Sequence, residues 1–382
     1  MLHVAIIGGG TVGGGVVEML AKYYPSIQIE YLIVGNLDRK RDFQIPKNTK
    51  ISDNWNIIKS DTHVNLVVEL MGGTDIAWDI IQYSLSNGIS VVTANKALIS
   101  KRITEIEKLC QENKCNFMYE AAVCGGIPII NTLLRSMHGD ELSSIGGVMN
   151  GSTNWMLDQM TKDSALSYNT LLVQAKNLGY LEADPSADIL GWDARSKLCI
   201  LIRIAFGVAV KEDDLVCRGI HTVSQEDISF AKSQGKTIKL LARAWKTTNT
   251  VQAFVAPALV DANTALGNLP GAGNCVEFNA KFSGHNVIIG SGAGRYPTAN
   301  SVVADILAAR SCAVQLPFGL SDASVQFASD FTAKFFIRTP VELEGTSRVS
   351  ESVCVTDTAI SHSQLTALLT QCDSSTSVLI GL

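Results

Sequence analysis

The chain has few charged residues and few prolines. Only 18% of its 382 residues are charged and only 9 are proline, whereas 46% are hydrophobic. Disordered proteins combine high net charge with low hydrophobicity, so this composition predicts a folded chain, and the length predicts two or three domains. The net charge of -5 at pH 7 gives no electrostatic reason to expect nucleic acid as a partner, which leaves small molecules as the better expectation.

Cysteine pairs and long apolar runs are also missing. The nine cysteines include no Cys-x-x-Cys pair and have no histidines at zinc-site spacing, so we expect neither a disulfide framework nor a zinc site, and a reducing compartment is favoured. The longest apolar stretch, residues 198–210, contains Arg203 and is shorter than the about 20 residues that a membrane-spanning helix needs. No secretion signal is recognisable at the N-terminus, so we expect a cytoplasmic protein without a membrane partner.

A glycine-rich turn near the N-terminus predicts a dinucleotide site. The apolar run 2–7 predicts a strand, the pattern at 16–20 predicts a helix, and a Gly-x-Gly-x-x-Gly sequence joins them. Its first glycine permits a tight turn, the second lets the backbone approach a pyrophosphate, and the third lets the helix pack on the strand. The alternative is a glycine-rich loop that holds no ligand. The predicted cofactor-binding residues of this turn are Gly8, Gly10, Thr11, Val12 and Gly13.

The second predicted strand, residues 29–34, bears on the choice of coenzyme. Sites for NAD usually place Asp or Glu at the tip of this strand, on the ribose hydroxyls. Here the strand ends at Gly35-Asn36, and the basic run Arg39-Lys40-Arg41 follows. Three cations could hold a 2′-phosphate, so the sequence favours NADP over NAD; the alternative is a solvated loop of mixed charge.

Further strands and helices alternate along the first third of the chain. Alternation of this kind predicts an α/β fold with a doubly wound parallel sheet, a Rossmann domain. Ligands of such sheets bind beyond the carboxyl ends of the strands, so Gly73, Thr93, Lys96 and Glu120 fall on the cofactor side. The predicted strands cover residues 65–70, 89–93 and 116–120, and the predicted helices cover residues 76–86 and 97–112.

Carboxylates and one lysine are concentrated in the segment 178–198. Asp193 and Lys197 are four residues apart on the helix predicted over 192–208, so they share a face. An exposed pair of this kind is worth only a few tenths of a kcal/mol, but this helix is too apolar to be a surface helix. The segment therefore predicts a site for a polar substrate. Before it we expect a polar cap at 151–154, helices at 155–160 and 168–177, and a loop at 181–190. The other carboxylates of the segment are Glu182, Asp184 and Asp188.

Several ordered motifs resemble homoserine dehydrogenase, and the resemblance covers about residues 1–310. After the glycine turn it continues through Gly191, Asp193 and Lys197. The motifs that carry it are Thr93-Ala-Asn-Lys96, Glu120-Ala-Ala-Val-Cys-Gly-Gly-Ile-Pro-Ile-Ile130, Met149-Asn-Gly-Ser-Thr-Asn154, Leu178-Gly-Tyr-Leu-Glu-Ala-Asp-Pro185 and Gly292-Ala-Gly294.

The resemblance implies an NAD(P)-dependent enzyme that interconverts L-aspartate 4-semialdehyde and L-homoserine, in the biosynthesis of threonine, methionine and isoleucine. Hydride transfer to the aldehyde creates an alkoxide that needs a proton, and Lys197 is suited to supply it. Asp193 would hold this lysine and contact the substrate, while Glu182 and Asp188 suit the substrate ammonium group. The family places a second catalytic or binding lysine at Lys96. Gly179 and Gly292 are further cofactor-binding candidates by this resemblance.

The resemblance also implies a monovalent cation, usually sodium. Glu120 would give a carboxylate oxygen, and Val123, Gly125 and Ile127 would give backbone carbonyls. The alternative is a structural turn in which Glu120 caps neighbouring amides. Two departures from the family are visible: Gly35-Asn36 stands where many members have Arg-Asp, and Cys124 stands where Ala or Gly is common.

We expect three segments along the chain. The Rossmann domain covers residues 1–133 and is completed by about 292–310, an α+β substrate-binding and dimerisation domain covers 134–291, and a short C-terminal appendage, which resembles a truncated ACT unit, covers 311–382. By resemblance the chain is monofunctional and forms a homodimer or larger homo-oligomer. The competing interpretations are another amino-acid dehydrogenase, such as aspartate dehydrogenase, and a catalytically inactive nucleotide-sensing regulator.

Overall fold

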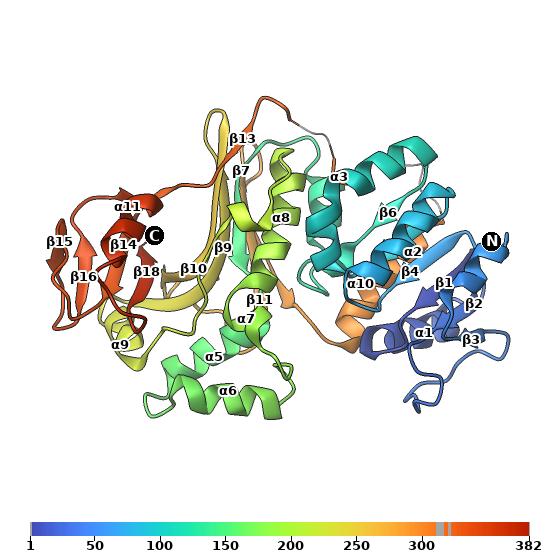
Figure 1. The fold of residues 1–382 in the computed structure, drawn as a ribbon, viewed down its shortest axis with the longest axis horizontal. Helices are drawn as coiled ribbons and strands as arrows, with labels where there is room; N and C mark the ends of the chain where they lie inside the picture. Colours follow the sequence, from blue (N-terminus) through green and yellow to red (C-terminus); the bar gives the residue numbers. More distant parts are fainter. Residues whose placement is uncertain (1, 311–316, 320–321, 382) are drawn as a thin grey trace. The chain divides into compact units, whose positions relative to one another are not determined.

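The fold consists of two compact units (Figure 1). It comes from a computed structural model that describes residues 2–310, 317–319 and 322–381. Unit 1 comprises residues 1–139, 203–209 and 291–322, and unit 2 comprises 140–202, 210–290 and 323–382. The start of the predicted C-terminal appendage, residues 311–316, lies outside the described residues. In the described part of the chain, no helix is long and apolar enough to cross a membrane.

Unit 1 is built on a six-stranded parallel sheet, which confirms the predicted Rossmann fold. The strand order β3-β2-β1-β4-β5-β6 is the doubly wound order of dinucleotide-binding domains. Figure 1 shows the helices lying along the sheet. The strands are β1 (His3–Ile7), β2 (Gln28–Ile33), β3 (Lys50–Ser52), β4 (Leu66–Glu69), β5 (Ser90–Thr93) and β6 (Phe117–Met118). The main helices are α1 (Thr11–Tyr23), α2 (Asp75–Ser86), α3 (Lys96–Asn113) and α10 (Arg295–Ala309).

The central strands of this sheet are apolar on both faces because helices cover both. Val4, Ile6 and Leu66 have no exposed surface, as expected for a parallel sheet. Helix α10, orange in Figure 1, comes from far along the sequence and joins the same core as α1. A Cβ atom on Gly15 would lie 3.0 Å from the Cβ of Ala299, so small residues allow the two helices to pack closely.

Unit 2 contains a mixed sheet with the order β12-β11-β7-β9-β10-β18-β14-β16-β15. Strands β7, β9, β10 and β11 pair antiparallel, and β18 joins β10 in parallel through Ala258 and Ile380. The described C-terminal residues from 323 onward therefore extend the sheet of unit 2. The strands are β7 (Leu142–Val148), β8 (Val216–Cys217), β9 (Lys236–Lys246), β10 (Thr250–Asp261), β11 (Gly273–Ala280), β12 (Gly284–Ser291), β13 (Gln326–Ala328), β14 (Thr332–Arg338), β15 (Thr346–Arg348), β16 (Val353–Thr356), β17 (Ile360–Ser361) and β18 (Ser377–Gly381).

The helices of unit 2 correct two details of the sequence analysis. Residues 151–154, predicted as a cap, are the first turn of α5, and Asn150 is its N-cap because its side chain accepts a hydrogen bond from the amide of Thr153. The loop predicted at 181–190 contains the short helix α7, which starts directly after Pro185. The helices are α5 (Gly151–Lys162), α6 (Tyr168–Asn177), α7 (Ser186–Ile189), α8 (Trp192–Phe206), α9 (Gln225–Ser233) and α11 (His362–Leu369).

Candidate active site

The glycine-rich turn of unit 1 leaves space for a ligand at one of its three glycines. Gly8 has φ of 110°, and a Cβ there would lie 2.5 Å from the carbonyl oxygen of Leu70. A Cβ on Gly13 would lie 1.9 Å from the carbonyl oxygen of Gly8. Gly10, the N-cap of α1, has no atom within 4 Å of its Cβ position. Gly8 and Gly13 are thus required by the close approach of neighbouring backbone. Gly10 has open space beside it, and the first amides of α1, at Thr11 and Val12, directly follow this position.

The loops after β4 and β5 are held together by a buried carboxylate that the sequence analysis missed. Glu69 is fully buried, accepts a hydrogen bond from the Thr93 hydroxyl at 2.7 Å and accepts another from the amide of Met71 at 2.9 Å. Asn95 donates to the carbonyl of Gly73 at 2.7 Å and caps the start of α3. Lys96 is the first residue of α3 and follows the end of β5 closely. It therefore lies at the carboxyl edge of the sheet, as predicted.

The loop after β2 holds one of its three cations in place. Arg41 donates from Nη2 to the carbonyl of Asn36 at 2.7 Å and from Nη1 to the carbonyl of Arg39 at 2.8 Å. Its Nε atom would lie 3.3 Å from a Cβ on Gly9, so the guanidinium stem passes the glycine-rich turn. Arg39 and Lys40 are exposed. This loop therefore presents positive charge beside the predicted phosphate site.

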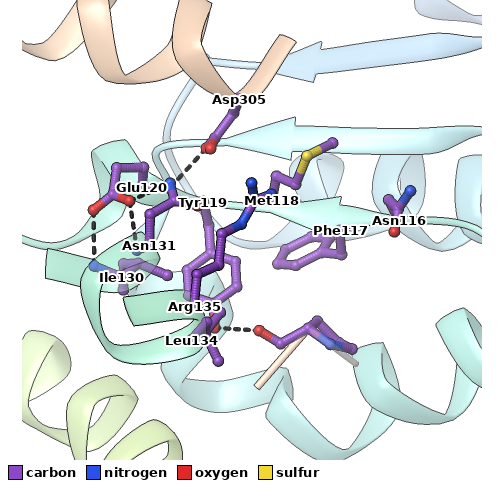
Figure 2. Close-up of a pocket in the computed structure, with 11 residues that line it drawn as sticks. Asn116, Phe117, Met118, Tyr119, Glu120, Ile130, Asn131, Leu134, Arg135 and Asp305 are labelled. Atoms are coloured by element: carbon purple, nitrogen blue, oxygen red, sulfur yellow. Dashed lines mark hydrogen bonds between the residues drawn. The ribbon is translucent and has the colours of Figure 1, made fainter. Parts of the chain in front are cut away.

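The side chain of Glu120 caps a short helix (Figure 2). This carboxylate is 2% exposed, and it accepts hydrogen bonds from the amides of Ile130 at 2.8 Å and Asn131 at 2.7 Å, in the helix α4 (Ile129–Asn131). The Asn131 side chain donates to it as well. The backbone amide of Glu120 donates to Asp305 at 2.8 Å. These contacts match the alternative in which Glu120 serves a structural turn.

The proposed cation ligands fit only in part. Both carboxylate oxygens of Glu120 already face N–H donors, which repel a cation. The carbonyl of Gly125 accepts from the Ser301 hydroxyl at 2.7 Å, and that of Ile127 accepts from the amide of Ile129 at 2.8 Å, so each keeps one lone pair. Among the described residues, no cluster of three or more His, Cys, Asp or Glu side chains is arranged to hold a metal. The Glu120 side chain is therefore a poor ligand, and the cation stays a prediction.

A cavity of about 40 Å³ lies beside this turn, lined in part by Glu120, Arg135 and Asp305. Figure 2 shows the Glu120 side chain directed at the amides of Ile130 and Asn131, and Asp305 directed at the backbone amide of Glu120. Burial raises the pKa of Glu120, and burial raises the pKa of Asp305 to about 7. The two carboxyl groups are thus part of a tightly packed structural junction.

In unit 2, the predicted ion pair of α8 is buried. Lys197 is 7% exposed and Asp193 is 9% exposed. The Nζ atom of Lys197 donates to Asp193 at 2.7 Å and to the carbonyl oxygen of Met149, at the end of β7, at 2.6 Å. An ammonium group has three hydrogens, so one remains for a ligand. Burial distinguishes this pair from an exposed pair on a solvated helix.

Asn150 joins two of the predicted substrate carboxylates, and the sequence analysis missed it. Its Nδ2 donates to Asp188 at 2.5 Å and to Asp193 at 2.9 Å. Its Oδ1 accepts from both the amide and the hydroxyl of Thr153, which fixes the orientation of the amide group. A neutral donor between two carboxylates reduces their repulsion. The N-cap pattern of Asn150 followed by Thr153 was visible in the sequence, but the contact with α7 was not.

In unit 2, Glu182, Asp184 and Gly179 make no hydrogen bond to this cluster in the described structure. Glu182 is exposed and makes no hydrogen bond or ion pair within the described part of the chain. Asp184 accepts hydrogen bonds from the amide and hydroxyl of Ser186, so it shapes the turn before α7. Gly179 ends α6 with φ of 76°, and the carbonyl of Gly292 lies 2.5 Å from a Cβ on Gly125. The positive φ of Gly179 explains that glycine by backbone geometry, and the close approach of the Gly292 carbonyl explains why position 125 is glycine.

The sheet order and the glycine-rich turn define a dinucleotide-binding α/β protein, and unit 2 adds a buried lysine–carboxylate pair. The family model of the homoserine dehydrogenase NAD-binding domain matches residues 8–120, and the homoserine dehydrogenase model matches residues 128–307. The chain therefore belongs to the homoserine dehydrogenase family.

Relatives and solved structures agree with this assignment. The chain is 37% identical over 316 residues to homoserine dehydrogenase of Synechocystis, covering 80% of this chain and 72% of the relative. It is 34% identical over 315 residues to that of Bacillus subtilis, with the same coverage of 80% and 72%. A crystal structure of a homoserine dehydrogenase from Thiobacillus denitrificans superposes with a TM-score of 0.87 at 28% identity, over 100% of this chain and 98% of that one.

Proposed function

We propose that this enzyme reduces L-aspartate 4-semialdehyde to L-homoserine with NADPH, and that Lys197 donates the proton. The observation that carries the proposal is the buried Lys197, whose ammonium group is held by Asp193 and by the Met149 carbonyl at 2.7 and 2.6 Å. Family membership supports the same reaction. In this scheme the product enters threonine, methionine and isoleucine biosynthesis.

Unit 1 would hold the coenzyme. The amides of Thr11 and Val12 at the start of α1 suit the pyrophosphate, and Gly10 leaves room for it. When bound, the nicotinamide supplies a hydride to the aldehyde carbon. Gly73, Thr93 and Lys96, at the carboxyl edge of β4 and β5, would line the nicotinamide side, with Thr93 fixed by its bond to Glu69.

Lys197 would protonate the oxygen of the former aldehyde. Two of its hydrogens are directed by Asp193 and Met149, and the third remains for the substrate oxygen. A fixed donor near the oxygen is the arrangement that general acid catalysis requires. In the reverse reaction the same amine would accept the proton of the homoserine hydroxyl.

The substrate ammonium would bind the carboxylates that Asn150 holds together. Asp188 and Asp193 both accept from Asn150, and Asp193 also accepts from Lys197. A carboxylate has about four acceptor positions, so this anionic pair suits a substrate ammonium group. Glu182 is exposed in the described structure, and its contact with the ammonium group stays a proposal.

The preference for NADPH rests on the loop after β2. Arg41 is held beside the glycine-rich turn, exposed Arg39 lies near it, and the tip of β2 lacks the carboxylate typical of NAD sites. A hyperthermophilic archaeal homoserine dehydrogenase mutant in complex with NADPH superposes with a TM-score of 0.69 at 25% identity, which supports the coenzyme class.

We also propose a homodimer formed through the sheet of unit 2, in the cytoplasm. Strand β12 alternates between exposed and half-buried positions and exposes Ile289 by 56%, and Phe282 beside it is 75% exposed. Apolar side chains on an edge strand favour burial in an assembly. The eight cysteines in the described part of the chain are free thiols, which fits a reducing compartment. Light scattering after gel filtration tests the dimer, and a monomer mass contradicts it.

A steady-state assay tests the reaction. We expect purified protein to oxidise NADPH when given L-aspartate 4-semialdehyde, with NADH as the poorer coenzyme. Turnover with oxaloacetate and ammonia instead would favour the aspartate dehydrogenase alternative, and coenzyme binding without turnover would favour the regulator alternative.

A further inference from the structure

Arg218 is a largely buried cation without a carboxylate partner in the described structure. It follows β8, and in the described part of the chain the one polar contact of its side chain is between Nη2 and Nε2 of His362, at 3.4 Å. Burial lowers the pKa of the Arg218 guanidinium, and no acid offsets this effect. Other arginines of the chain, Arg195, Arg203 and Arg338, each lie within 4.0 Å of a carboxylate. Burying a charge without a partner of opposite charge destabilises the folded state, so the position of Arg218 favours binding of an anion.

Arg218 lines a pocket of about 240 Å³ within unit 2, which we name the Arg218 pocket. Its lining includes His221, Thr376 and Trp192, and no acidic residue is among the residues that form it. The Nε atom of Arg218 and the hydroxyl of Thr376 are buried and have no hydrogen-bond partner in the described part of the chain. Buried polar atoms in folded proteins nearly always have a partner, so two orphaned donors at one pocket indicate a missing acceptor.

The backbone around Arg218 is fixed from both sides. Its amide donates to the carbonyl of Val255 in β10 at 2.7 Å, and the amide of Ile220 donates to the carbonyl of Ile189 at 2.8 Å. A Cβ on Gly219 would lie 2.1 Å from that same carbonyl oxygen, so glycine allows this close approach. A cation on such a backbone is preorganised, which lowers the entropy lost when a ligand binds.

We propose that the Arg218 pocket binds a small oxyanion, a carboxylate or a phosphate. The guanidinium group can donate two parallel hydrogen bonds to either group, and the Thr376 hydroxyl can donate a third. A water molecule needs about 10–15 Å³ of cavity volume. The Arg218 pocket, at about 240 Å³, therefore has room for a small organic anion. The proposal concerns binding alone and does not depend on the proposed reaction.

Titration calorimetry and thermal unfolding test this site with two probes, inorganic phosphate and malonate, at constant ionic strength. We expect at least one probe to bind saturably and to raise the unfolding midpoint. Arg218→Gln should abolish this response, and Thr376→Val should weaken binding about tenfold because one charge-assisted hydrogen bond is lost. Arg243→Gln, which removes the same charge from a half-buried position of the same unit, should retain the response.

The two probes separate the chemical sources. Binding of malonate assigns the site to carboxylates, and binding of phosphate alone assigns it to phosphoryl groups. Anion binding at the coenzyme loop instead of the Arg218 pocket would persist in Arg218→Gln and would overturn the proposal. The proposal is overturned if neither probe binds, or if Arg218→Gln binds both as the unchanged protein does. Without an anion, Arg218→Gln should unfold at the same or a higher temperature, because an unpaired buried charge has been removed.

Discussion

Asn150→Asp is the substitution that most sharply tests the carboxylate cluster. Asp is as good an N-cap as Asn, so the start of α5 keeps its cap. The Nδ2 donor is replaced by an oxygen, and the hydrogen bonds to Asp188 and Asp193, at 2.5 and 2.9 Å, are lost. Three carboxylates then occupy the place of two carboxylates and a donor.

The size of the effect follows from these contacts. A hydrogen bond to a charged group contributes about 1.5–3 kcal/mol, so losing two contacts that position the substrate groups is expected to cost about 3 kcal/mol. This value corresponds to a fall of roughly 100-fold in kcat/KM. Like charges in contact raise the pKa of the cluster, so a shared proton at lower pH restores a donor between the carboxylates.

The assay is kcat/KM for aspartate semialdehyde between pH 6 and 9. We expect the deficit of Asn150→Asp to be largest at the alkaline end and to shrink as the pH falls. Ser167→Asp provides the control, because it exchanges the N-cap of α6, at an exposed position, and should leave kcat/KM unchanged. If kcat/KM of Asn150→Asp stays within twofold of that of the unchanged enzyme, with the same pH profile, the bridging role of Asn150 is refuted.

Three further predictions concern the other parts of the account. Lys197→Met should lower kcat by about 100-fold or more while NADPH binding, measured by fluorescence titration, stays unchanged; unaltered turnover would remove Lys197 from the mechanism. Arg41→Gln should raise the KM for NADPH about tenfold or more and leave that for NADH unchanged, whereas an equal effect on both coenzymes would show a merely structural role. Burial lowers the pKa of Lys239 from its ordinary value of 10.5 to about 8. Between these two pH values the folded state binds fewer protons than the unfolded state, so the free energy of unfolding rises with pH in that window. The unfolding free energy of the enzyme relative to Lys239→Met should thus increase by about 1.5 kcal/mol from pH 8 to 9.5, as measured by urea unfolding, and a constant difference would contradict the shifted pKa.

The Rossmann unit is the part that the sequence predicts best. Its strands are short apolar runs that end at glycines or small polar residues, and a parallel sheet covered on both faces needs this pattern. The predicted strand 65–70 is one residue longer than β4 at both ends, and the predicted strand 89–93 starts one residue before β5. Of the predicted strand 116–120, only β6 (Phe117–Met118) forms. The chain enters a short 3-10 helix at Glu120, whose side chain caps α4.

In unit 2, residue spacing alone predicted a contact of the candidate site only where the two residues are neighbours along one helix. Asp193 and Lys197 share a face of α8, which the spacing alone reveals. Asn150 meets Asp193 across 43 residues and Glu69 meets Thr93 across 24, and no local pattern encodes such contacts. The pairing of β18 with β10 joins residues that are still further apart in sequence, and no local pattern encodes it either.

Direct hydride transfer to the aldehyde is the central claim, and deuterium labelling tests it most directly. The enzyme is given L-aspartate 4-semialdehyde and NADPH that carries deuterium at the transferable position of the nicotinamide, and the product is analysed by mass spectrometry and NMR. The account predicts L-homoserine with one deuterium on the carbon that bears the new hydroxyl group. Coenzyme oxidation without homoserine, or homoserine without deuterium at that carbon, would contradict it.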